Sequence, residues 1–135
     1  MMISTRGRYA VRVMSELGTN PDDLTPLKSI ADKQDISQKY LENIMSMLVK
    51  AKLVAGASGK GGGYKLVKEP KDYTLYEILE VTEGDLYPVT CLTGDDGPCK
   101  KAGLCHAFPI WKGLSDVINE YLEGKTLQDV IDSSK

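Results

Sequence analysis

Residues 25–52 read TPLKSIADKQDISQKYLENIMSMLVKAK and contain two helical patterns separated by a short break. Thr25 followed by Pro26 predicts an N-cap with proline at the first helical position, which opens the first helix. Ser37 predicts the cap of the second helix, whose apolar residues recur on one face. Residues 33–36 (KQDI) are expected to form the turn between them. This spacing predicts a helix-turn-helix unit, which in DNA-binding proteins places its second helix in the major groove.

The flanking segments extend this unit to a winged form. Residues 5–17 (TRGRYAVRVMSEL) place apolar side chains at helical spacing, and residues 52–70 (KLVAGASGKGGGYKLVKEP) indicate a strand, a glycine-rich turn and a second strand. Glycine-rich loops can bind nucleotide phosphates, but no Ser or Thr follows Lys60 and no helix follows the loop. The glycines therefore predict a hairpin turn. The expected fold class is mainly α with a small β-hairpin, a winged helix-turn-helix domain followed by a long dimerisation helix.

Two further helices are expected towards the C-terminus. Residues 74–84 predict a short helix, and residues 107–124 predict a long one that ends at Gly124, followed by a short helical turn capped by Thr126. The apolar stripe of the long helix has no intrachain partner large enough to cover it. We expect it to pair with the same helix of a second copy, giving a homodimer with the two-fold symmetry of a palindromic operator. The stripe consists of Trp111, Leu114, Ile118, Tyr121 and Leu122.

The chain is expected to divide into three parts: a DNA-binding domain (residues 1–82), a cysteine loop (residues 83–106) and a dimerisation region (residues 107–135). Its net charge of −2 conceals an asymmetry. Residues 1–72 hold 12 basic and 8 acidic residues, giving +4, whereas residues 73–135 hold 5 and 11, giving −6. A basic first half favours contact with phosphates. No apolar run approaches the roughly 20 residues of a membrane span, and the N-terminus lacks a secretory signal, so we expect a cytoplasmic protein.

The polar face of the second helix carries side chains that can read base edges. Gln38 and Asn43 can pair with adenine, Lys39 with guanine or phosphate, and Glu42 can accept from cytosine N4. A merely solvated helix face is the alternative. Phosphate contacts, which position a protein without reading sequence, are expected from other residues nearby. These are Ser4, Thr5, Arg6, Arg8, Tyr40, Lys60 and Lys65, of which Lys60 at the wing tip can alternatively enter the minor groove. Ser37 is also expected among the DNA-binding residues.

Residues 91–106 (CLTGDDGPCKKAGLCH) contain every cysteine of the chain and its only histidine. A zinc site would normally present paired C-x2–4-C motifs, which the spacing C-x7-C-x5-C-H lacks. Three separated thiols in a glycine-containing loop are closer to the needs of an iron–sulfur cluster. From the residues alone, a metal or cluster site, a thiol redox sensor and coincidence all remain open. No combination of base, nucleophile and orienting residue indicates an enzyme.

Taken together, these motifs resemble the Rrf-two family of bacterial transcription regulators, in its iron–sulfur-sensing, IscR-like branch. The resemblance is nearly full length and rests on TRGRYAV, SIADKQDIS, YLENI, LVKAKLV, SGKGGGYKL, TLYEILEVTEG and three cysteines before a Trp-bearing helix. It implies a homodimeric winged-helix regulator with a cluster, usually [2Fe–2S], held in the cysteine loop. By position, the resemblance makes Cys91, Cys99 and Cys105 the ligands. It also puts Gln38, Lys39 and Tyr40 on the recognition helix and Gly62, Gly63 and Tyr64 in the wing.

The cysteine loop departs from the pattern of that branch in two ways. Seven residues separate the first two cysteines instead of five, and the position of the fourth ligand, three residues after the last cysteine, is Phe108 instead of histidine. His106 is the replacement candidate, but it is adjacent to Cys105, and both could reach one cluster only with an irregular backbone. Two alternatives stay open: a metal-free thiol redox switch in the same DNA-binding dimer, and a protein whose helix-turn-helix serves protein contacts.

Overall fold

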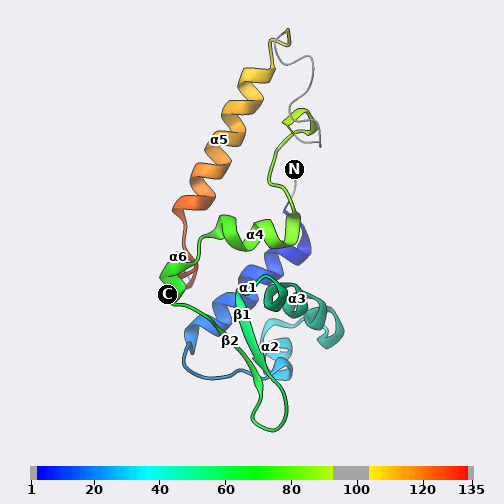
Figure 1. Ribbon diagram of the computed structural model, residues 1–135, viewed down its shortest axis with the longest axis vertical. Coiled ribbons are helices and arrows are strands. Elements are labelled where there is room, and N and C mark those ends of the chain that lie inside the picture. Colours follow the sequence, from blue (N-terminus) through cyan, green and yellow to red (C-terminus); the bar gives the residue numbers. More distant parts are fainter. Residues whose placement is uncertain (1–2, 93–103, 134–135) are drawn as a thin grey trace.

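The computed structural model describes residues 3–92 and 104–133 (Figure 1). Its helices are α1 (Thr5–Thr19), α2 (Leu27–Gln34), α3 (Gln38–Lys50), α4 (Leu75–Glu83), α5 (Phe108–Gly124) and α6 (Leu127–Ser133). The strands β1 (Val54–Ala57) and β2 (Gly63–Leu66) form one antiparallel hairpin, and short 3₁₀ turns occur at η1 (Pro70–Asp72) and η2 (Thr90–Leu92). The predicted fold class, mainly helical with a small hairpin, is confirmed.

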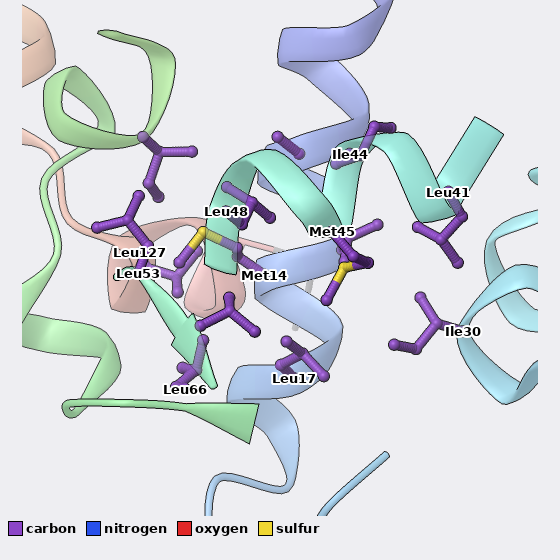
Figure 2. Packing of buried hydrophobic residues seen from close by; sticks show 14 of the residues in the cluster. Met14, Leu17, Ile30, Leu41, Ile44, Met45, Leu48, Leu53, Leu66 and Leu127 are labelled. Atoms are coloured by element: carbon purple, nitrogen blue, oxygen red, sulfur yellow. The ribbon is translucent and has the colours of Figure 1, made fainter. Parts of the chain in front are cut away.

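The core lies between α1 and α3. Figure 2 shows Met14 and Leu17 of α1 facing Met45 and Leu48 of α3, and all four side chains are at most 1% exposed. Side chains of α2, α4, α6, the base of the hairpin and Tyr73 also belong to the cluster. Because a fully buried aliphatic side chain contributes about 1.5–3 kcal/mol, this cluster is the main source of stability for the helix-turn-helix unit.

Hydroxyl side chains cap four of the helices. Ser37 Oγ accepts from the Tyr40 amide at 3.2 Å, which confirms the predicted cap of α3, and Ser4 and Thr74 cap α1 and α4 in the same way. Thr126 Oγ1 accepts from the Asp129 amide at 3.1 Å, which confirms the predicted cap of α6. The predicted cap of α2 is wrong, because Pro26 occupies the N-cap and no side chain caps the helix. The backbone of Thr25 pairs with Tyr64 of β2 instead, through two hydrogen bonds of 2.9 Å. The wing is thereby joined to the entrance of α2.

The turn of the helix-turn-helix starts two residues later than the sequence predicted. α2 continues to Gln34, and Asp35 ends it in the left-handed conformation (φ 54°, ψ 50°), which Asp tolerates better than most residues. The Ile36 amide then donates to the Ala31 carbonyl at 3.0 Å. The turn is therefore a hydrogen-bonded helix end that leads directly into α3.

The C-terminal part of the chain returns to the start of α4. The Leu75 amide donates to the Lys125 carbonyl at 2.9 Å, and the Leu127 amide donates to the Tyr73 carbonyl at 3.0 Å. α6 then packs against α1, and Figure 1 shows α5 extending away from the body on the side opposite the hairpin. Within the described ranges, no helix combines the length and apolar character needed to cross a membrane.

Candidate DNA-binding surface and cysteine segment

The first two turns of α3 present the predicted base-reading side chains to solvent. Gln38, Lys39, Glu42 and Asn43 are all exposed, while the apolar face of the same helix is buried. Tyr40 is half-buried. Its ring lies 5.8 Å from that of Tyr9 in an edge-to-face arrangement, with an interplanar angle of 84°. The start of the recognition helix is therefore packed against α1 and its polar face is free to meet a partner.

A groove of about 720 Å³ separates α3 from the wing. Glu42, Ser46 and Lys50 line its helical side, and residues 56–59 and 62–64 line the other. These three side chains follow each other at four-residue spacing, so they lie in one row along the helix. Ser46 and Lys50 were not among the predicted DNA-binding residues, although this spacing is visible in the sequence.

The wing carries its two lysines at different places on the hairpin. Lys60, at the turn, and Lys65, on β2, are both exposed. Gly59 and Gly61 adopt positive φ (90° and 81°), as a tight hairpin turn requires. A side chain at Gly63 would collide with the backbone of Thr25, so the close approach of wing and helix-turn-helix depends on this glycine.

The predicted phosphate-contacting residues of α1 fall into two groups. Ser4 donates from both its amide and its hydroxyl to Glu83 Oε1 at 2.8 Å, and Arg6 Nη2 donates to the Thr82 carbonyl at 2.9 Å. These bonds join the start of α1 to the end of α4. Thr5 and Arg8 are exposed and bond to each other at 3.0 Å.

The cysteines flank a segment whose centre, with Cys99, lies outside the described residues. Cys91 is half-buried in η2, and Cys105 and His106 are exposed just before α5. Both described cysteines are free thiols. Within residues 3–92 and 104–133, no three His, Cys, Asp or Glu side chains gather as a metal site.

The donor set of this segment fits an iron–sulfur cluster chemically. It offers three thiols, the ligands that such clusters require, and one imidazole. The backbone at Cys105 and His106 is neither helix nor strand, and the Phe108 amide donates to the Cys105 carbonyl at 3.3 Å to close a turn. An irregular backbone is what the neighbouring side chains of Cys105 and His106 need in order to approach the same cluster.

The apolar stripe of α5 is divided between two environments. Leu122 is only 7% exposed because it packs against Leu79 and Leu86, and Ile118 is partly buried by the same cluster. Leu122 is thus covered within its own chain, and its predicted place in a dimer interface stays a prediction. The other predicted residues are open to solvent, with Trp111 at 38%, Leu114 at 42% and Tyr121 at 61% exposure. Two further exposed residues that the sequence analysis missed, Ile110 and Val117, lie on the same helix.

An apolar hollow of about 420 Å³ lies where the base of α5 meets α1 and α4. Tyr9 and Val11 of α1, Leu75 of α4 and Tyr121 of α5 contribute to its walls. Tyr121 belongs both to the exposed apolar residues of α5 and to the wall of this hollow.

Comparison with known proteins agrees with this architecture. The family model Rrf2, described as an iron-dependent transcriptional regulator, matches residues 3–133. The HTH-type transcriptional regulator CymR of Bacillus subtilis (strain 168) is 38% identical over 131 residues, covering 96% of this chain and 89% of CymR. Its solved structure, titled as that of the global cysteine regulator, has a TM-score of 0.82 at 35% identity and covers 100% of this chain and 99% of that one. T. potens IscR has a TM-score of 0.79 at 32% identity and covers 100% of this chain and 89% of its own. The chain belongs to the Rrf2 family of transcriptional regulators.

Proposed function

We propose that this chain is a homodimeric regulator whose binding to a palindromic operator is modulated by an iron–sulfur cluster, of the [2Fe–2S] type, on Cys91, Cys99 and Cys105. The observation that carries the proposal is the gathering of all three thiols and the only imidazole within residues 91–106. The irregular backbone before α5 and the iron-dependent description of the family model support it. His106 is proposed as the fourth ligand.

DNA reading is assigned to α3 and the wing. The exposed amides of Gln38 and Asn43 suit adenine, Glu42 suits the amino group of cytosine, and Lys39 suits guanine or a phosphate. Lys60 and Lys65 extend the positive surface along the wing. A two-fold dimer would present two copies of α3 to half-sites about 34 Å apart, one turn of the duplex.

The dimer contact is assigned to the exposed side of α5. This 17-residue helix is about 25 Å long and leaves five large apolar side chains in solvent, namely Ile110, Trp111, Leu114, Val117 and Tyr121. A contiguous apolar surface of this kind marks an interaction site in soluble proteins. A second copy of the helix, with the same stripe, is a chemically matched cover for it.

Signal transfer is assigned to the junction between the cysteine segment and α4. Residues 84–90 connect α4 to Cys91. The end of α4 is itself hydrogen-bonded to the start of α1, through Ser4 with Glu83 and Arg6 with Thr82. A change in the segment can therefore alter how α1 and α5 lie relative to α4, and a ligand shifts this equilibrium only by binding one arrangement more tightly. When bound, a cluster supplies a redox centre sensitive to oxidants.

The first experiment is anaerobic purification followed by a visible spectrum and iron and sulfide analysis of the same sample. Absorption at roughly 320–460 nm with matching iron and sulfide is expected for a cluster. Cys91→Ala, Cys99→Ala and Cys105→Ala are each expected to remove the colour and leave the helical content unchanged. A colourless, iron-free protein even after reconstitution would refute the cluster, and unfolding of the iron-free form would indicate a structural metal instead.

DNA binding is tested separately, with a duplex that the protein selects from a random-sequence pool. Affinity is expected to fall steeply with salt, and Lys39→Ala is expected to reduce the slope of log K against log salt by about 1. Lys112→Ala is the matched control, because Lys112 lies on α5 and pairs with Asp116 at 3.3 Å. A flat salt dependence would favour protein contacts for the helix-turn-helix.

A metal-free thiol switch is the second candidate, favoured by two observations. Cys91 and Cys105 are free and Cys105 is exposed, and the chain is similar to CymR, titled the global cysteine regulator. In that reading two thiols become a disulfide and pass two electrons and two protons to an oxidant such as diamide. Iron-free protein should then lose or gain operator affinity on diamide treatment and recover on reduction. An affinity insensitive to diamide would exclude it.

A further inference from the structure

Arg12 contacts the first helix of the helix-turn-helix directly and the second through one neighbouring aromatic ring. It lies on α1, outside the predicted DNA-binding residues, and its side chain is exposed. Its Nη2 donates to the main-chain carbonyl of Gln34 at 2.6 Å, and its Nε donates to the side-chain Oε1 of the same residue at 3.0 Å. The guanidinium is thus held in one orientation by two bonds.

Gln34 is the last residue of α2. The final carbonyls of a helix have no partner within the helix and carry the negative end of its dipole, so a guanidinium stabilises them. Asp35 follows in the left-handed conformation and starts the turn into α3. Gln34 Nε2 also donates to Glu16 Oε2 at 3.3 Å, and Glu16 pairs with Lys33 at 2.8 Å. Arg12 therefore belongs to a polar network that fixes the end of α2 on α1.

The same guanidinium also lies over the ring of Tyr9, with Cζ 5.0 Å from the ring centroid. This cation–π contact fixes the ring whose edge-to-face partner, Tyr40, is in the first turn of α3. The Tyr40 amide in turn donates to the α3 cap, Ser37 Oγ. One side chain thus contacts the end of α2 directly and the start of α3 through a single ring.

We propose that Arg12 is a positioning residue for DNA recognition: it orients α3 relative to α2 without itself contacting DNA. This inference rests on the proposed DNA-binding function. The Nε and Nη2 of Arg12 are held by Gln34, so we expect Arg12 to contribute to operator affinity through the geometry of α3. A phosphate contact would instead contribute through counterion release.

The test measures affinity for the selected duplex at several salt concentrations, and for an unselected random duplex, in Arg12→Ala and Arg12→Lys. Both variants are expected to bind the selected duplex about tenfold more weakly, with the salt slope and the affinity for random duplex unchanged. Arg12→Lys is not expected to restore the affinity, because a single ammonium cannot reproduce the two hydrogen bonds to Gln34 and the stacking on Tyr9. Lys60→Ala, the phosphate-contact control, should lower the slope by about 1.

Amide hydrogen exchange of the DNA-free protein gives a readout independent of DNA. The amides of Ile36 and Tyr40, bonded to Ala31 and Ser37, should exchange about tenfold faster in both variants. Unchanged exchange, or unchanged affinity for the selected duplex, overturns the positioning role. A slope reduced by about 1, with equal weakening on random duplex and rescue by lysine, overturns it in favour of direct phosphate binding. If the wild-type protein selects no duplex, the proposed function fails, and the exchange rates still decide whether Arg12 orders the turn.

Discussion

Replacing Tyr73 by phenylalanine should destabilise the fold far more than the loss of one atom suggests. Tyr73 is fully buried, and its hydroxyl donates to the Leu53 carbonyl at 2.7 Å. The same oxygen accepts from the amides of Val67 at 3.0 Å and Lys68 at 3.3 Å. Leu53 precedes β1 and Val67 follows β2, so one hydroxyl joins both ends of the wing to the segment before α4.

The size of the effect follows from these three partners. Phenylalanine keeps the ring and its packing, so the change comes from the lost hydrogen bonds. The buried Leu53 carbonyl, left unsatisfied, costs about 1–3 kcal/mol, and the two partly buried amides, which can turn to water, add about 1 kcal/mol together. We expect Tyr73→Phe to lower the free energy of unfolding by about 3 kcal/mol. That change corresponds to roughly 10 °C in Tm for a chain of this size.

The assay is urea denaturation followed by far-UV circular dichroism, at a fixed protein concentration because a dimer's stability depends on it. Tyr87→Phe is the matched control, since Tyr87 is 43% exposed, and it should change stability by no more than about 0.5 kcal/mol. A loss below about 1 kcal/mol for Tyr73→Phe would refute the reasoning, because it would mean that the three backbone groups do not depend on the hydroxyl.

Three further predictions concern α5, the wing and α6. Leu114→Glu should give folded monomers in analytical ultracentrifugation. Leu122→Ala should keep the dimer and lower its free energy of unfolding by about 2–4 kcal/mol. The reverse result would mean that the side of α5 with Leu122, and not the side with Leu114, makes the dimer contact. Gly63→Ala should weaken binding to the selected duplex and speed wing amide exchange, since its Cβ meets the Thr25 backbone; unchanged binding and exchange would show that the approach can relax. The pKa of Asp129 is lowered, first of all by the hydrogen bond that its carboxylate accepts from the Thr126 backbone amide just before α6. The ionised carboxylate therefore stabilises the fold above pH ~4, and this stabilisation disappears as the pH falls through the lowered pKa. Asp129→Asn should therefore reduce stability at pH 7 and flatten the acid side of the stability curve, and identical curves would contradict this.

Local sequence signals predicted the helices well because their causes are local. The apolar positions of α3 and its cap at Ser37 lie within a few residues of one another, so their pattern determines both the helix and its buried face. Thr25 and Pro26 form an equally strong local cap signal, yet the backbone of Thr25 pairs with Tyr64, 39 positions later. A local motif cannot report a competing partner that the fold brings to it.

The candidate site shows the same division. The chemistry of Gln38, Asn43 and the cysteines was visible in the sequence, because residue type alone determines what a side chain can bind. The burial of Leu122 was not visible in the sequence. Helical periodicity indicates an apolar stripe, but it does not indicate how much of the stripe α4 covers. The role of Arg12 depends on Gln34, which lies 22 positions away and becomes a neighbour only through packing.

The chain leaves the core at the start of α4 and returns to the same place after α5. This return has a consequence for how the segment between these two helices can vary in length. Residues 75 and 125 are hydrogen-bonded to each other, so the whole excursion through α4, the cysteine segment and α5 begins and ends at one place on the core. A change in length between α4 and α5 leaves the spacing at this base unchanged, because the hydrogen bond between Leu75 and Lys125 closes the base outside it. The longer spacing between the first two cysteines is therefore compatible with the same base. By the same reasoning, a segment of different length and chemistry can be placed between α4 and α5 without redesigning the helix-turn-helix unit.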